Sequence, residues 1–267
     1  GAEMRKITEP LERVMAGTVA TPIIIRVKPG TLNELASRLT LDYKVAGLKI
    51  PRFNMYATIL PIDVIDEVEG FDFVEKIYLD REVRIPEIRG VGVSFDPVKR
   101  FLARIAEYTP RKAVRRKREW LPTSESRKLI EADKAEMEGY RGEGVKVAVV
   151  DSDSSYRYTS HVQLRGRVTG KSVIEEASDK NGHGGHVSTT AIGGRFVDRV
   201  TLLEAYGVAP RATGIGIKVL RGVAGMGSTS DVIKGIEYAT NWGADVINLS
   251  LGGSPTKNPE DDPMYPV

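Results

Sequence analysis

The sequence contains no cysteine, which excludes disulfides, thiolate nucleophiles and cysteine-ligated metals. It has no apolar run approaching the roughly 20 residues that cross a bilayer, so neither a transmembrane segment nor a membrane partner is expected. The formal net charge is only +3, which indicates no nucleic-acid partner. Histidine is scarce, with three residues in 267, so imidazole chemistry has few candidates. The composition, 41% hydrophobic and 28% charged, is typical of a globular protein.

The pattern of the sequence changes along its length. Residues 1–19 are predicted to be an N-terminal extension, and residues 20–86 a small α+β unit. In that unit PIIIRVK reads as a β-branched strand closed by Pro-Gly, and TLNELASRL places its apolar residues on one helical face. The predicted order of elements is β-α-β-β-α-β, a ferredoxin-like arrangement.

A basic segment follows at residues 87–125. Within it Arg111–Arg118 carries six basic residues in eight. The segment fits a solvated linker between domains, and also an exposed processing region, since proteases cut mobile surface segments. Binding of nucleic acid is the weakest alternative, because the run has one aromatic neighbour, Trp120, and no second basic face.

Residues 126–267 have the pattern of an α/β domain. Apolar, β-branched runs typical of buried parallel strands alternate with helices, which predicts a parallel, doubly wound sheet. Serine and glycine mark the ends of one helix, with Ser228 or Ser230 as N-cap and Gly243 as stop. The expected strands are Val145–Asp151, Ala212–Leu220 and Ala244–Gly253, and the expected helices are Ser124–Tyr140, Gly185–Gly194 and Ser228–Gly243.

Asp151 and His183 are the strongest candidates for chemistry. Asp151 ends an apolar strand, and ligands gather at the carboxyl ends of parallel strands. His183 lies among glycines at the start of a helix, where the backbone can approach other groups closely. A histidine held by a buried carboxylate is the arrangement of a general base.

A metal site is the competing interpretation of the same stretch. His183 and His186 stand three residues apart and, with Asp151 or Asp153, could serve a metal-dependent hydrolase. The usual glutamate between paired zinc histidines is absent, and a third ligand is not evident. His186 is instead expected to be a packing residue on the first helical turn, and His161 a surface residue.

Four blocks, in order, resemble the subtilisin-like serine proteases, or subtilases. They are GVKVAVVDSDSS, NGHGGHVSTTAIGG, GVAPRATGIGIKVL with GMGSTSDVIKGIEYA, and GADVINLSLGG, and all lie within about residues 126–254. The first two correspond to the aspartate and histidine motifs of the family. Residues 20–86 are similar in position and pattern to the family's N-terminal prodomain. The resemblance implies a partial subtilisin-like sheet preceded by a ferredoxin-like prodomain.

The resemblance also implies roles for individual residues. Asp151 would orient the imidazole, and His183 would be the general base and then the acid for the leaving amine. Two backbone edges would clasp an extended peptide substrate by β-augmentation, and the prodomain would assist folding and block the cleft with its C-terminal tail. These edges are Gly225, Met226 and Gly227 on one side, and Ser250, Leu251 and Gly252 on the other.

The sequence departs from the family in several places. It has no Gly-Thr-Ser-Met-Ala-like motif with the nucleophilic serine, and Asn248 is not the counterpart of the oxyanion-hole asparagine. The aspartate motif carries a second acid, Asp153, in place of glycine, and the histidine motif carries Gly185 in place of threonine. No cofactor is required. The resemblance leaves a structural calcium ion possible, but the family's usual calcium loop is not visible, so no metal site is assigned. The family is commonly secreted, but no signal peptide is recognisable, which leaves the compartment open.

The leading hypothesis is therefore the N-terminal portion of a serine endopeptidase zymogen that is inactive without its nucleophile. Its expected partners are a peptide substrate, its own prodomain, and either a C-terminal chain carrying the serine or a second copy. Self-association would use the sheet edge that the missing strands would leave exposed. A non-catalytic peptide-binding or assembly protein on the same scaffold is the alternative.

Overall fold

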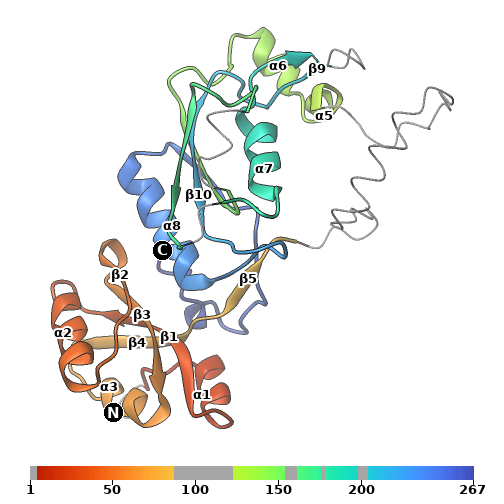
Figure 1. Cartoon of the computed structure of the whole chain (residues 1–267). Coiled ribbons are helices and arrows are strands. Elements are labelled where there is room, and N and C mark those ends of the chain that lie inside the picture. Colours follow the sequence, from red (N-terminus) through yellow and green to blue (C-terminus); the bar gives the residue numbers. More distant parts are fainter. Residues whose placement is uncertain (1–4, 87–122, 154–160, 176–177, 198–203) are drawn as a thin grey trace.

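The computed structural model describes residues 5–86, 123–153, 161–175, 178–197 and 204–267, and the basic run lies outside these ranges. The described residues form two units that meet beside one helix (Figure 1). None of their helices has both the length and the apolar character that crossing a bilayer would require.

The N-terminal unit is a four-stranded antiparallel sheet with strand order β2-β3-β1-β4. Its two longer helices pack on one face, because alternate residues of β1 such as Ile23 and Ile25 point toward them. Ile24 points to the opposite face, which meets the second unit. The elements are β1 (Ala20–Val27), α2 (Leu32–Asp42), β2 (Leu48–Ile50), η1 (Pro51–Phe53), β3 (Met55–Pro61), α3 (Ile62–Glu69) and β4 (Val74–Leu79).

The segment predicted to be an extension belongs to this unit. Helix α1 (Glu9–Met15) buries Leu11 completely in the core of the N-terminal unit. Ile7 pairs with Ile77 of the edge strand β4 in a parallel bridge, and Thr8 N donates to Ile77 O at 3.1 Å. The sequence before residue 20 is too short and too mixed in pattern to reveal this packing.

The second unit is built on a parallel sheet with strand order β12-β6-β10-β7. Helix α7 covers one face and α8 the other, which gives the expected α/β layering (Figure 1). The central strands β6 and β10 are almost wholly buried, as their β-branched runs predict. The elements are β6 (Lys146–Asp151), β7 (Val168–Ser172), α7 (His183–Ile192), β10 (Thr213–Lys218), α8 (Thr229–Trp242) and β12 (Val246–Asn248).

Two predicted elements differ from the structure. The segment 244–253 contains only the three-residue strand β12, at a sheet edge, with Val246 51% exposed, so the prediction of a buried strand was wrong. Helix 124–140 is broken into α5 (Thr123–Leu129) and α6 (Ala132–Met137) at Glu131, whose φ is 59°. Among the described residues, no strand pairs with the outer side of β12. The remaining short elements are β8 (Phe196–Val197), β9 (Glu204–Ala205) and η2 (Pro259–Asp261).

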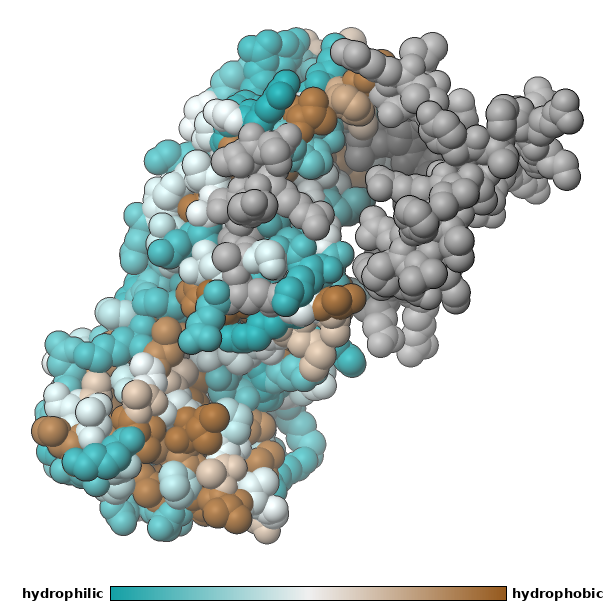
Figure 2. All heavy atoms as spheres, in the orientation of Figure 1, coloured by the Kyte–Doolittle hydropathy of each residue, from teal (hydrophilic) through white to brown (hydrophobic). Residues whose placement is uncertain are grey.

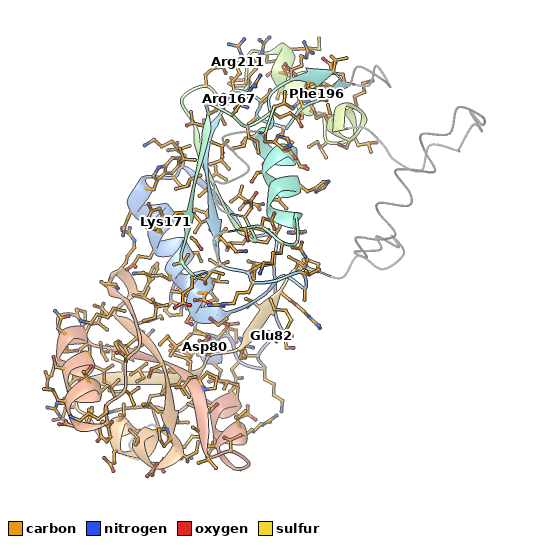
Figure 3. The ribbon with its side chains drawn as sticks, in the orientation of Figure 1. Asp80, Glu82, Arg167, Lys171, Phe196 and Arg211 are labelled. Atoms are coloured by element: carbon orange, nitrogen blue, oxygen red, sulfur yellow. The ribbon has the colours of Figure 1, made fainter. Side chains whose placement is uncertain are left out.

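The two units are joined by a strand and by polar contacts along α8. Strand β5 (Glu82–Arg84) leaves the N-terminal unit and pairs with β11 (Met226–Ser228) of the second. Asp80 and Glu82 lie at this junction (Figure 3). On the flank of α8, Arg52 N donates to Glu237 Oε1 at 2.6 Å. If the N-terminal unit were separated from the second unit, it would expose the apolar sheet face that contains Ile24. Hydrophobic side chains also gather on the surface of the N-terminal unit that faces the viewer in Figure 2.

Candidate active site

Asp151 is buried where strand β6 ends. Its carboxylate is fully shielded from solvent, and Oδ1 accepts a hydrogen bond from Ser152 N at 2.6 Å. Its main-chain oxygen accepts hydrogen bonds from Val219 N and Leu220 N at 2.8 and 3.2 Å. The backbone of Asp151 is therefore tied to the residues that follow β10, and its carboxylate is held by Ser152 N.

His183 is the first residue of α7 and faces Asp151. Its Nδ1 lies 2.9 and 3.0 Å from the two carboxylate oxygens. Gly182 precedes it with φ 89°, a backbone conformation that glycine adopts readily. Because Nδ1 is occupied by Asp151, Nε2 is the nitrogen that can exchange a proton with a bound molecule.

The surroundings raise the pKa of His183 above 6.5. The hydrogen bond with Asp151 is the largest cause, and the negative charges of Asp151 and Asp179 add to it. Burial of the ring acts in the opposite direction. The protonated form of the imidazole is thus stabilised. A general base needs this stabilisation, because it carries a proton between two steps of a reaction.

A polar group that the sequence did not single out supports this pair. Asp179 Oδ1 accepts hydrogen bonds from Asn181 N at 2.9 Å and Gly182 N at 2.7 Å, which shapes the turn before α7. It also accepts from Ser152 Oγ at 3.2 Å, and Ser152 Oγ accepts from Gly184 N at 2.9 Å. The Asp-x-Asn-Gly sequence is a turn signal that would have identified Asp179.

The two unusual motif residues are neighbours in space. Asp153 is 1% exposed. A Cβ built on Gly185 would lie 3.4 Å from Asp153 Oδ2, and one on Gly184 would lie 2.7 Å from Asp153 N. The contact at Gly185 is an ordinary van der Waals distance, whereas the one at Gly184 is too short for a side chain, so Gly184 is the position that needs glycine.

The other histidines lie elsewhere. His186 is exposed on α7, which corrects the expectation that it packs in the first turn. His161 is half-buried, and its Nδ1 accepts a hydrogen bond from Gln163 N at 3.3 Å. Among the described residues, no cluster of three or more histidine, aspartate or glutamate side chains could hold a metal ion. The described residues therefore offer no set of ligands that would support the metal-site alternative.

The predicted peptide-clasping edges hold a segment of the chain itself. Strand β5 pairs antiparallel with β11, with Arg84 opposite Met226 and Val83 opposite Gly227. Ile85 N donates to Gly225 O at 3.2 Å. A Cβ on Gly225 would lie 3.0 Å from Ile85 Cδ1, so glycine allows this close approach.

The opposite edge completes the arrangement. Arg84 N donates to Gly252 O at 2.9 Å, and Gly252 N donates to Arg84 O at 3.0 Å. Leu251 packs in the core of the unit, and Ser250 Oγ donates to Asn248 Oδ1 at 3.0 Å instead of contacting β5. Thus Gly225, Met226, Gly227 and Gly252 pair with the segment Glu82–Ile85 through their main chains, whereas the side chain of Ser250 does not contact β5.

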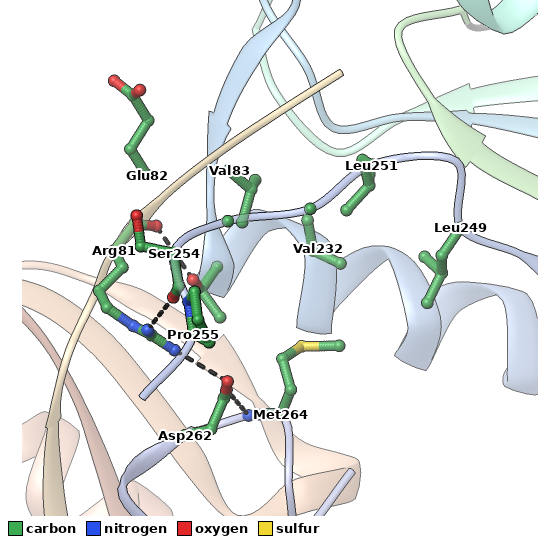
Figure 4. A pocket seen from close by; sticks show the side chains of 13 residues that line it. Arg81, Glu82, Val83, Val232, Leu249, Leu251, Ser254, Pro255, Asp262 and Met264 are labelled. Atoms are coloured by element: carbon green, nitrogen blue, oxygen red, sulfur yellow. Dashed lines mark hydrogen bonds and ion pairs between the residues drawn. The ribbon is translucent and has the colours of Figure 1, made fainter. Parts of the chain in front are cut away.

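The buried side chain of the clasped strand, Val83, points into an apolar cavity of about 220 Å³ (Figure 4). Val83 is 8% exposed, whereas its neighbours Glu82 and Arg84 are exposed. At the polar end of the cavity, Arg81 Nη2 donates to Asp262 Oδ2 at 2.9 Å. The other apolar residues that line the cavity are Val232, Leu249, Leu251 and Met264.

Comparison with known proteins agrees with this geometry. The family model described as the subtilase family matches residues 142–263. Subtilisin DY of Bacillus licheniformis is 42% identical over 128 residues, which cover 47% of this chain and 43% of that protein. Alkaline elastase YaB of Bacillus sp. (strain YaB) is 31% identical over 192 residues, covering 71% of this chain and 45% of the relative.

A third relative is the major intracellular serine protease of Bacillus subtilis (strain 168). It is 36% identical over 141 residues, covering 50% of this chain and 41% of the relative. The matches span less than half the length of these three relatives. The family match covers the segment that carries Asp151, His183 and both clasping edges. The segment 142–263 therefore belongs to the subtilisin-like serine protease family.

Proposed function

We propose that the chain is the N-terminal portion of a subtilisin-like serine endopeptidase zymogen. One observation carries the proposal. A candidate base, His183, is held by the carboxylate of Asp151 in a domain whose clasping edges hold an extended segment of the chain. His183 would take the proton of a serine hydroxyl through Nε2 and later give it to the leaving amine. Asp151 would hold the ring in the correct tautomer and stabilise its positive charge.

The serine that this base would activate lies outside this chain in our proposal, so the chain by itself is inactive. Strand β12 is the proposed place where further structure joins. It has an unpaired outer side among the described residues, and Val246 and Leu249 there are 51% and 38% exposed. A sheet edge of this kind pairs readily with another segment. A C-terminal chain carrying the serine, or a second copy, would satisfy it.

The N-terminal unit is proposed to be a ferredoxin-like prodomain that occupies the cleft with its C-terminal tail. Two features support this proposal. Its order of elements after α1 is β-α-β-β-α-β, and the tail is held by main-chain hydrogen bonds on both sides. Processing would take place in the segment that follows Pro86.

Asp80 of this proposed prodomain caps α8. Its Oδ1 accepts a hydrogen bond from Ser230 N at 3.0 Å, and Oδ2 accepts one from Ser230 Oγ at 2.5 Å. The helix also has its own N-cap, Ser228, whose Oγ accepts from Asp231 N at 3.2 Å. An external cap on the helix that covers the sheet is a physical means by which a prodomain assists folding.

The docking of the two units is expected to weaken as the pH rises from 4 to 8. Burial raises the pKa of Asp80 from 3.8 to about 6, although the hydrogen bonds from Ser230 lower it. The carboxyl group of Asp80 therefore keeps its proton to higher pH when the two units are docked than when they are separate. The contribution of Asp80 to docking is fully present below pH 4 and is lost as the pH passes 6. The equilibrium constant for docking should fall by on the order of 100-fold over this range.

Amide hydrogen exchange at Thr229 and Ser230, measured from pH 4.5 to 8, checks this expectation after correction for the intrinsic pH dependence. The matched control is Asp80→Asn, which keeps a hydrogen-bond acceptor but removes the titrating group. The variant should lose most of the pH dependence of these amides. Identical pH profiles for the two proteins would contradict it.

Reaction with a fluorophosphonate tests the proposed activity, because the reagent labels only an activated serine. In protein isolated from its native source, the label should be found on the polypeptide that contains His183, or on a polypeptide bound to it. His183→Ala should abolish the labelling, and the chain of 267 residues alone should remain unlabelled. A native protein that binds peptides but is never labelled would favour the non-catalytic peptide-binding alternative.

A further inference from the structure

Lys218 is a buried lysine to which the proposed mechanism gives no role. It is the last residue of β10, is 0% exposed, and stands in register with Asp151 of β6. Its Nζ donates hydrogen bonds to Ser152 O and Leu220 O, both at 2.7 Å. Burying a lysine is costly unless its amino group is well satisfied, so this position is a specialised one.

One of the two carbonyls belongs to the network that positions the base. Ser152 N donates to Asp151 Oδ1, and Ser152 Oγ accepts from Gly184 N in the first turn of α7. Asp151 in turn holds His183. A displacement of Ser152 would therefore move the carboxylate and the start of the helix that carries the imidazole.

The other carbonyl lies at the base of the peptide-clasping turn. Leu220 N donates to Asp151 O, and the next residue, Arg221, exchanges two main-chain hydrogen bonds with Met226, at 2.7 and 3.1 Å. That turn presents Gly225 and Met226 to strand β5. The position of Leu220 thus sets where one clasping edge stands relative to Asp151.

We propose that Lys218 is a positioning residue whose amino group fixes the Asp151–His183 pair relative to the peptide-clasping edge at 225–227. A single nitrogen with three donors on a flexible stem can join two carbonyls in a closed space, which an apolar side chain of similar shape cannot do. The inference rests on the proposed function for its catalytic meaning. The coupling itself can be measured without turnover.

The test is Lys218→Met in the full chain, since methionine has a similar unbranched shape but no donor. The first readout is the low-field proton resonance of His183 Nδ1–H, which reports the hydrogen bond with Asp151. The resonance should shift or disappear in the variant. The second is exchange of the Ile85 amide, which donates to Gly225 O and should exchange about tenfold faster.

Two controls separate positioning from general stability. Lys171 lies on the neighbouring strand β7, opposite Ile217, and is exposed, so Lys171→Met should change neither readout. Because the chain has no cysteine, Lys218→Cys introduces a single thiol. Aminoethylation of that thiol in the unfolded chain, followed by refolding, rebuilds a lysine-like amine and should restore both readouts, whereas capping with iodoacetamide should not.

An unchanged His183 resonance with unchanged Ile85 exchange in Lys218→Met would overturn the proposal. Equal acceleration at the β10 amides of Ile215 and Ile217 would also overturn it, because it would show only a loss of fold. If the methionine variant does not fold, the comparison of aminoethylated with capped Lys218→Cys decides the question. Failure of fluorophosphonate labelling leaves these readouts intact, because neither needs a nucleophile.

Discussion

Replacing Asp151 with asparagine is expected to lower the pKa of His183 and, in the complete enzyme, to reduce kcat by about 10⁴-fold. The side chain of Asp151 supplies both the largest cause and a further charge effect that raise this pKa, while burial of the ring lowers it. Without the carboxylate, burial acts against Asp179 alone. The asparagine amide also favours the wrong tautomer of the ring, which accounts for the loss of rate.

NMR titration of the histidine ring protons checks the first part in the chain itself. Asp179→Asn should lower the pKa of His183 by a smaller amount, since Asp179 acts only through its charge. A pKa of His183 that is the same in wild type and Asp151→Asn would contradict the assigned pair.

The sequence predicted those parts of the fold that local chemistry determines. The β-branched runs of β6 and β10 are buried parallel strands, as expected. Helix α8 begins and ends at the predicted caps, with Ser228 accepting from Asp231 N and Gly243 at φ 81°. Strand β7, VTGKS, was missed because its glycine and polar residues give no strand signal.

Other features depend on neighbours that the sequence pattern does not reveal. An apolar run does not show whether its strand lies in the centre of a sheet or at an edge, which explains the error at β12. The helix break at Glu131 has no glycine or proline to announce it. In the site, the end of an apolar strand identified Asp151. The local turn sequence marks Asp179 as a turn residue, but its hydrogen bond with Ser152, 27 residues away, is not visible in the sequence pattern.

Introducing a charge at Val83 is expected to free the cleft. The side chain of Val83 is buried in one apolar cluster with Val232 and Leu251 and lines the cavity with them, while the main chain of β5 supplies the pairing. An ionised aspartate there would lose its hydration among apolar side chains, and the guanidinium of Arg81 in the same cavity is already paired with Asp262, so the cost is about 3 kcal/mol. At pH 8, Val83→Asp should therefore increase the fraction of molecules with a free strand by at least about 100-fold.

Exchange of the Arg84 amide, which donates to Gly252 O, reports this opening directly. Val83→Ala should give a smaller increase, because it removes only apolar contact. Glu82→Gln changes an exposed neighbour on the same strand and should have no effect. The amides of Ile24 and Ile25, in the core strand β1, should exchange as in the wild type, which separates release of the strand from unfolding of its unit. If Arg84 exchanges no faster in Val83→Asp, main-chain pairing alone holds the strand. The cavity would then contribute nothing to its retention, and in the complete enzyme the same variant would leave the cleft as inaccessible to peptides as before.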